Sequence, residues 1–280
     1  MTSAGLEAEL RAVDEATASF GPKHPETLRA LGDLAEAQSA IGDDVAASET
    51  LSSTLAAWEQ LGAEGEVGAI QTEHVLAQVR FRLGDLNGAR LAQERVVAAV
   101  ETTFGIDNDT GVQALSDLAA TNMAMGRIES ALALQARRAS VIAVLDGPAS
   151  RRALQARATV AMTLRKLGRF AEALEVDAQA LEEAEAVPLD LRFLLDSRRH
   201  LIEDFAGLKD WTSAARVLVE LFDLGMAGLE ETDDLRVYLE EYRLVFEELA
   251  CDLQRNKVRK GTVVILMRGG LLASWVGRRR

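Results

Sequence analysis

The sequence has few of the residues that cross-link a small fold or interrupt its helices. Its single cysteine, Cys251, cannot form a disulfide framework within the 280 residues and is typical of a reducing compartment. Only four prolines are present, and proline interrupts a helix because it lacks a backbone donor. Together with an aromatic content of 5%, these absences favour an all-helical chain over a disulfide-rich domain.

Long apolar runs are also missing. No stretch approaches the roughly 18 consecutive apolar residues of a transmembrane helix. The N-terminal segment 1–7 has no basic region followed by an apolar run, so we expect no secretory signal there. With the lone cysteine, these features predict a cytoplasmic protein without a transmembrane segment.

Residues that would form a metal, phosphate or catalytic site are sparse and scattered. The three histidines, His24, His74 and His200, lie far apart in the sequence, and no cluster has metal-ligand spacing. Segment 107–111 starts like a calcium loop but lacks the glutamate expected six residues after its glycine, which favours helix caps. Segment 62–68 lacks the Gly-Lys-Ser/Thr of a phosphate loop, and no serine lies in a nucleophile elbow. We therefore expect no metal, no cofactor and no enzymatic activity.

Negative charge dominates the chain, but it is unevenly distributed. The formal net charge is −13, whereas residues 251–280 contain eight lysines and arginines against one acidic residue, Asp252. The residues before this segment therefore carry a net charge of −20. Nucleic-acid phosphates need a basic surface, so we exclude nucleic acid and expect a protein or peptide partner of basic character.

The main positive feature of the sequence is a repeat of fixed length. Four glycines recur every 42 residues, each preceded by an apolar–alanine pair and followed five residues later by another alanine. The glycines are Gly42, Gly84, Gly126 and Gly168, and the flanking alanines are Ala35/Ala47, Ala77/Ala89, Ala119/Ala131 and Ala161/Ala173. A constant period of this size predicts a solenoid of helical hairpins.

Each part of the repeat has a physical role in a pair of helices. The apolar spacing before the glycine is helical rather than strand-like. Glycine adopts the left-handed conformation at little steric cost and so ends the first helix. The two alanines allow the paired helices to approach closely, and a larger side chain would overpack their crossing at a cost of roughly 1–3 kcal/mol.

This pattern resembles the tetratricopeptide repeat (TPR), which has a large and a small residue in its first helix, glycine at the turn and alanine in its second helix. The period of 42 and the segment 20–28, which reads Phe-Gly-Pro-Lys-His-Pro-Glu-Thr-Leu, are similar to the long repeats of kinesin light chains. Those repeats usually have asparagine just before the apolar–alanine pair. This sequence departs from that pattern, since the corresponding residues are Asp33, Val75, Asp117 and Thr159.

The resemblance and the repeat spacing together predict an all-α fold, a TPR superhelix of about five helical hairpins with capping helices. Residues 1–24 are expected to form an N-terminal capping helix with a linker, and residues 25–225 the solenoid. A C-terminal capping helix should occupy 226–260, and 261–280 form a basic, apolar tail outside the pattern. The expected hairpins are 25–61, 67–103, 109–145, 151–186 and 191–224, the last with Lys209 in place of the glycine.

In TPR proteins the first helix of each hairpin lines a concave groove, and the resemblance implies which residues face it here. Amides would pair with the backbone of an extended peptide, and apolar side chains would form pockets for its side chains. The alternative is that these residues only form solvated helix faces or fill gaps in the core. The expected groove residues are Arg29, Glu36, Gln71, His74, Gln78, Phe81, Gln113, Ser116, Met123, Gln155, Met162, Arg165, Arg199 and Glu203.

These features predict a non-catalytic protein- or peptide-binding scaffold. The Lys/Asn set with which some TPR proteins bind a C-terminal carboxylate is absent, so a chaperone co-factor is not expected. A regulatory sensor whose groove is occupied by its own tail is the alternative of a different class. The tail 261–280 could also contact a membrane surface or another partner, or pack on the last helix. Deleting the tail separates the two functions, because only the sensor would then bind its partner more tightly.

Overall fold

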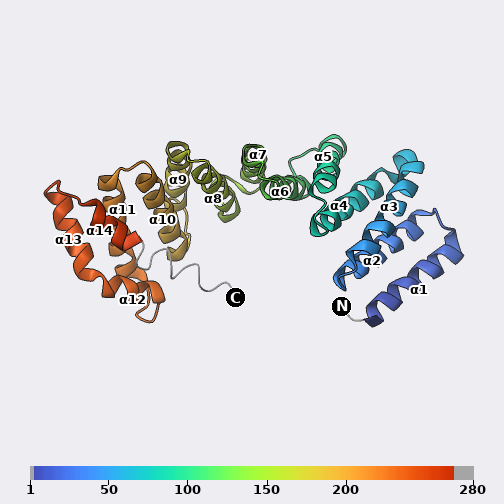
Figure 1. Cartoon of the computed structure of the whole chain (residues 1–280), viewed down its shortest axis with the longest axis horizontal. Helices are drawn as coiled ribbons and strands as arrows, with labels where there is room; N and C mark the ends of the chain where they lie inside the picture. Colours follow the sequence, from blue (N-terminus) through green and yellow to red (C-terminus); the bar gives the residue numbers. More distant parts are fainter. Residues whose placement is uncertain (1–2, 268–280) are drawn as a thin grey trace. The chain divides into compact units, whose positions relative to one another are not determined.

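The structure, a computed structural model, describes residues 3–267, and all regular elements in that range are helices (Figure 1). The expected all-α class is therefore confirmed. The helices form two compact units, which divide between Val141 and Ile142.

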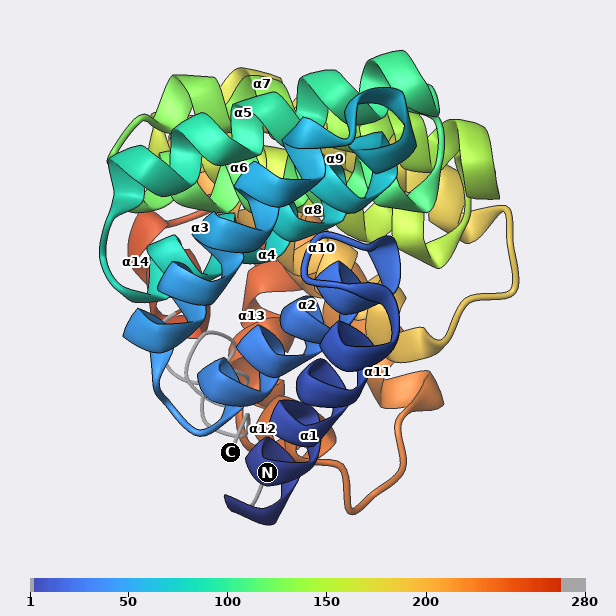
Figure 2. The ribbon, with the colours of Figure 1, turned by 90° about the vertical axis from the view of Figure 1, so that its right-hand side faces the viewer.

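In the first unit, each helix from α1 to α6 packs against the next one along the chain. Figure 2 shows this arrangement most clearly for α1, α2 and α3. A short 3₁₀ turn, Gly62–Gly65, precedes α4. The helices are α1 (Ser3–Phe20), α2 (Pro25–Ala40), α3 (Asp44–Gln60), α4 (Glu66–Arg82), α5 (Leu86–Thr103) and α6 (Asp109–Ala124).

Helix α7 (Ile128–Asp146) contains the division, and the second unit continues from it. Helices α8 to α11 again pack in chain order, and α12, α13 and α14 all contact α11. These helices are α8 (Arg151–Lys166), α9 (Phe170–Glu185), α10 (Leu191–Gly207), α11 (Trp211–Gly228), α12 (Asp234–Glu241), α13 (Arg243–Gln254) and α14 (Lys260–Leu266).

One turn geometry ends the first helix of each glycine-containing hairpin. The four repeat glycines have φ between +72° and +88°, a left-handed conformation that costs glycine little. At the first turn, the N–H of Asp43 donates to the carbonyl of Gln38 (2.9 Å) and that of Gly42 to the carbonyl of Ser39 (3.0 Å). The same two bonds recur at the other turns, and they satisfy carbonyls that the helix end would otherwise leave unpaired. The predicted role of the glycines is confirmed.

Polar side chains begin the helices next to these turns. Asp43, Asp85 and Asp210 each accept a hydrogen bond from the backbone N–H three residues later, at 2.9–3.1 Å. Asn108 begins α6 in the same way, accepting at 2.9 Å. Segment 107–111 thus leads into α6, and Asn108 satisfies a backbone donor at its start.

The alanine pairs lie in the core, as close approach of the helices requires. All eight repeat alanines are buried. Ala35 and Ala47 share an apolar cluster with Leu51 and Leu76, which brings together α2, α3 and α4. This alanine pair therefore lies where the first hairpin packs both internally and against α4.

The C-terminal cap differs from the expected single helix. The structure has two helices, α12 and α13, which meet at Tyr242. Leu235 of α12 and Phe246 of α13 belong to one core cluster, and Phe246 stacks on Phe222 of α11 with 4.6 Å between ring centroids. Shared packing on α11 explains the break, because the bend lets both apolar faces reach the same helix.

The first part of the expected tail is helical. Val263 and Leu266 of α14 are fully buried in that same cluster, and the hydroxyl of Tyr238 donates to the carbonyl of Leu266 (2.8 Å). Of the alternatives for segment 261–280, packing on the last helices describes the residues up to Met267. The remainder lies outside the described residues. A tail deletion that preserves this core should therefore begin after Met267.

Lys209 has φ of +62° at the turn between α10 and α11, where the other hairpins have glycine. The substitution Lys209→Gly should raise the free energy of unfolding by about 1 kcal/mol, because a β-carbon strains the left-handed conformation. Urea unfolding followed by circular dichroism measures this change. The matched substitution Gly168→Ala should lower the free energy by a similar amount. If Lys209→Gly were only as stable as the parent chain, the inferred backbone strain at Lys209 would be wrong.

Candidate functional site

Side chains from the first helices of the hairpins line four cavities, which contain most of the expected groove residues. Three cavities lie in the first unit. Their expected residues are Arg29, Glu36 and Gln71 (about 260 Å³), Gln71, His74 and Gln113 (about 370 Å³), and Gln78 and Phe81 (about 250 Å³). Ser116 and Met123, both half-buried on α6, line none of the four.

Asp117 of α6 organises the polar groove residues of the first unit. Its carboxylate accepts hydrogen bonds from the amides of Gln113 (2.8 Å) and Gln78 (3.3 Å). Nδ1 of His74 lies 3.6 Å from the same carboxylate. Three expected groove residues therefore converge on a residue that replaces the usual asparagine of the kinesin-type repeat.

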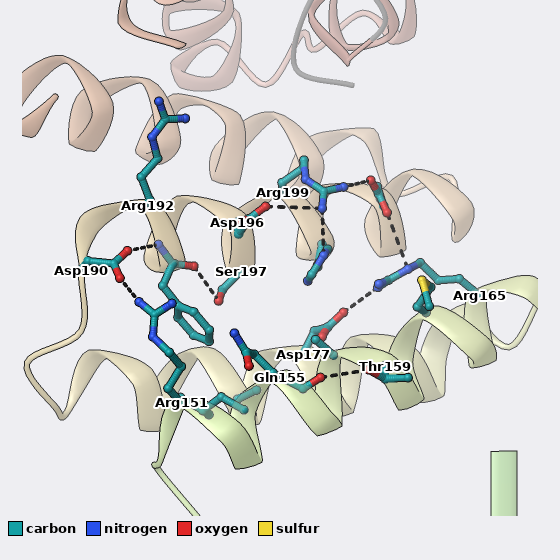
Figure 3. A pocket seen from close by; sticks show the side chains of 17 residues that line it. Arg151, Gln155, Thr159, Arg165, Asp177, Asp190, Arg192, Asp196, Ser197 and Arg199 are labelled. Atoms are coloured by element: carbon teal, nitrogen blue, oxygen red, sulfur yellow. Dashed lines mark hydrogen bonds and ion pairs between the residues drawn. The ribbon is translucent and has the colours of Figure 1, made fainter. Parts of the chain in front are cut away.

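The fourth cavity, about 510 Å³, lies in the second unit, and we call it the α8–α10 pocket (Figure 3). Helices α8 and α10 supply most of its lining, and Asp177 and Ala180 of α9 complete it. Figure 3 shows Gln155 projecting from α8 into this space. Five expected groove residues line it: Gln155, Met162, Arg165, Arg199 and Glu203.

Paired charges border one end of the α8–α10 pocket. Arg151 forms an ion pair with Asp190, and its guanidinium carbon lies 5.3 Å from the centre of the Phe193 ring. Arg192 forms an ion pair with Asp233. Because each arginine has an acidic partner, this end presents little net charge to a ligand.

An ion cluster occupies the other end of the pocket. Nη1 of Arg165 lies 2.5 Å from Asp177 and 3.1 Å from Asp204, and both carboxylates are buried. Nε of Arg165 also lies 3.6 Å from Glu203, which is paired with Arg199 at 2.5 Å. The charge of Arg165 is therefore neutralised within the protein, whereas we expected it to face a ligand.

Burial controls the protonation of two groups in this cluster. It raises the pKa of the Asp204 carboxyl to about 7, although the neighbouring Arg165 acts in the opposite direction. It lowers the pKa of His200 to about 3, and the positive charges of Arg199 and Arg165 add to this effect. His200 is therefore neutral near pH 7, and its Nε2 accepts a hydrogen bond from Arg199 (2.9 Å).

Between its two charged ends, the pocket has an apolar wall and one free amide. The wall is formed by Leu154, Ala158, Met162, Ala180 and Phe193. The side chain of Met162 is 46% exposed, so this part of the wall is accessible to a ligand. The side-chain amide of Gln155 is exposed and makes no hydrogen bond with any residue in the range 3–267. The pocket can therefore contact an apolar side chain and pair with a backbone amide at the same time.

Several residues of these sites were not expected from the sequence. Asp117 carried a signal, because it differs from the asparagine of the kinesin-type repeat. The sequence signal for Asp177 is weaker. The residues 42 and 84 positions earlier, Gln135 and Gln93, are also polar within a mostly apolar helix face. Phe193 carried none, because nothing in the repeat marks its position as facing a cavity.

Residues 153–187, which span most of α8 and all of α9, match the family model described as tetratricopeptide repeat. BtubC (BKLC) from P. vanneervenii has a similar structure, with a TM-score of 0.59, 16% sequence identity, and coverage of 83% of this chain and 96% of that one. TPR-like repeats assigned to a kinesin light chain of Podosopora anserina give a TM-score of 0.59 at 20% identity, covering 73% and 97%. None of the curated sequences compared with the chain matches it. The comparisons confirm the expected TPR solenoid fold.

Neither a metal cluster nor a membrane span accompanies these cavities in the part of the chain that the structure describes. No group of three or more His, Cys, Asp or Glu residues within 3–267 is placed to hold a metal ion. No helix in that range is both long enough and apolar enough to cross a bilayer.

Asp204 and His200 should make the free energy of unfolding depend on pH in opposite directions. The unfolded state ionises Asp204 near its ordinary pKa of about 3.9, so this group lowers stability as pH rises from about 4 to 7. The unfolded state protonates His200 near pH 6.5, so this group lowers stability as pH falls from 6.5 toward 3. In the parent chain, the two contributions oppose each other between pH 4 and 6.5.

Removing either group should reveal the pH dependence of stability that the other group contributes. Between pH 7 and 5, Asp204→Asn should lose at most about 2 kcal/mol of unfolding free energy on acidification, because Asp204 no longer opposes the contribution of His200 and only the raised pKa of Asp177 still acts in the other direction. His200→Gln should instead gain stability over the same interval, and its amide oxygen can still accept from Arg199. Urea unfolding at a series of pH values measures both slopes. Parallel pH profiles for the two variants would contradict the assignment.

Proposed function

We propose that this chain, which carries a tetratricopeptide repeat and has the fold of kinesin-light-chain-type repeat structures, is a non-catalytic scaffold that binds an extended segment of a partner protein. The α8–α10 pocket is the proposed binding site. The observation that carries the proposal is the free amide of Gln155 beside the exposed side chain of Met162. The proposed setting is the cytoplasm, in keeping with the lone cysteine.

An extended peptide fits this pocket better than a helix or a compact ligand. A peptide in extended conformation has unpaired backbone groups, and the Gln155 amide offers both a donor and an acceptor to them. Its alternate side chains point in one direction, so one of them can reach the wall formed by Leu154 and Phe193. The neutralised ends of the pocket favour recognition by shape and backbone pairing over recognition by charge.

The lining residues give little support to catalysis. His200 is neutral at neutral pH, but its Nε2 is already engaged by Arg199. Asp177 is buried and paired with Arg165, as is the neighbouring Asp204, which does not line the pocket. No residue lining the pocket is a cysteine or lysine, and its serine, Ser197, already donates to the carbonyl of Phe193 (3.0 Å). These contacts therefore favour a binding role over a catalytic one.

Selection from a random peptide display library on the full chain tests the proposal. Selected peptides should bind with an affinity that falls about tenfold in Gln155→Ala, because hydrogen bonds to the peptide backbone are lost. Ala158→Arg should abolish binding, since its side chain would fill the pocket. Isothermal titration calorimetry of one selected peptide measures both effects.

The control variant is Glu182→Ala, an exposed change on α9 outside the pocket lining, which should leave the affinity unchanged. The proposal is wrong if the library yields no binding peptide. It is equally wrong if selected peptides bind Ala158→Arg as tightly as the parent chain.

A further inference from the structure

Two sets of three residues have the same register in the repeat: each set has two residues in one hairpin, the second or the fourth, and one residue in the hairpin that follows it. Arg165, Asp177 and Asp204 come from the first helix, the second helix and the following helix of the second unit. The residues at the same places two repeats earlier are Phe81 of α4, Gln93 of α5 and Thr121 of α6, allowing for the one-residue shorter fifth hairpin. The two sets can therefore be compared position by position.

In the second unit this place is filled by the protein itself. The Arg165 guanidinium lies between Asp177 and Asp204 at 2.5 and 3.1 Å, and only 11% of the Arg165 side chain is exposed. The two buried acceptors thus have a cationic donor from within the chain.

In the first unit the same place is open. Phe81 stands where Arg165 would be and is 36% exposed, and a cavity of about 250 Å³ is lined by Phe81, Gln93 and Thr121. Gln93 is 3% exposed and Thr121 is fully buried. Neither Oε1 of Gln93 nor Oγ1 of Thr121 has a hydrogen-bond partner within residues 3–267. Buried acceptors without partners are costly, so both atoms favour a ligand that donates to them.

We propose that this cavity, the α4–α6 pocket, receives an arginine side chain of the partner protein, in the place that Arg165 occupies in the second unit. The inference rests on the proposed scaffold function and adds a basic residue to the partner's chemistry. A planar guanidinium can donate to Gln93 and Thr121 at once, which an ammonium does less well. The ring of Phe81 supplies a face on which the guanidinium can lie.

The charges at the α4–α6 pocket also favour a cation. Asp117 and Arg82 are the two charged residues that line it. Arg82 lies 3.0 Å from Asp44, a second acidic group that compensates its charge. Counting these three groups, one negative charge remains for an incoming arginine, and the strongly acidic composition of the chain acts in the same direction.

A small probe tests the pocket without knowledge of the partner. We would titrate the full chain with N-acetyl-arginine N-methylamide and follow the side-chain amide of Gln93 and the methyl group of Thr121 by NMR. The neutral citrulline counterpart, which has nearly the same shape, is the comparison ligand. The arginine probe should shift both signals and bind about tenfold more tightly than the citrulline probe, since hydrogen bonds to a charged group are stronger.

Two variants provide matched controls. Gln93→Leu removes the unpaired amide while keeping a buried side chain of similar size, and it should weaken the arginine probe about tenfold at the Thr121 methyl signal. Phe81→Arg should supply the missing guanidinium from within the chain, as Arg165 does, and abolish probe binding. Circular dichroism spectra and urea unfolding curves that match those of the parent chain show that both variants remain folded.

The outcomes separate this inference from the proposed function. If neither probe moves the signals of Gln93 and Thr121, or if citrulline binds as tightly as arginine, the arginine pocket is wrong. Peptide binding that depends on Ala158 would then still support the scaffold. If the arginine probe binds as expected but the library yields no peptide, the pocket stands and the proposed function is wrong.

Discussion

The close contact between paired helices is the constraint on which the rest of the structure depends. Ala35 and Ala47 contribute only a methyl group each, so α2 and α3 lie near enough to share a cluster with Leu76 of α4. Helices packed so closely must reverse direction within a few residues, which the left-handed glycines allow. The first helices then follow one another at regular intervals within each unit, and cavities form where their side chains do not fill the space between them.

One register position has two chemical outcomes in this chain. At α8–α10, a buried arginine satisfies two buried carboxylates, and the site is complete without a ligand. At α4–α6, an aromatic residue at the equivalent place leaves Gln93 and Thr121 without partners. Repetition of a fold therefore does not repeat its chemistry, because a single side chain decides whether a polar cavity is filled from within.

Much of the fold could be predicted from the sequence, because it depends on local rules with a fixed period. The glycine turns and buried alanines follow from conformational freedom and side-chain size, which act within a few residues. The break at Tyr242 could not be predicted, since the apolar periodicity continues across it and only packing on α11 causes the bend. Among the expected groove residues, identity alone did not reveal that Arg165 is neutralised by Asp177, because that pairing joins two helices.

The core of the second unit also has a consequence for the order in which the protein is made. Tyr238 and the residues around it pack against Val263 and Leu266, which follow them in the chain. On the ribosome, this core stays incomplete until α14 has emerged, whereas α1 to α6 can already pack against one another. The apolar surface of α11 and α13 that α14 covers is thus completed only after the residues up to Leu266 have been synthesised.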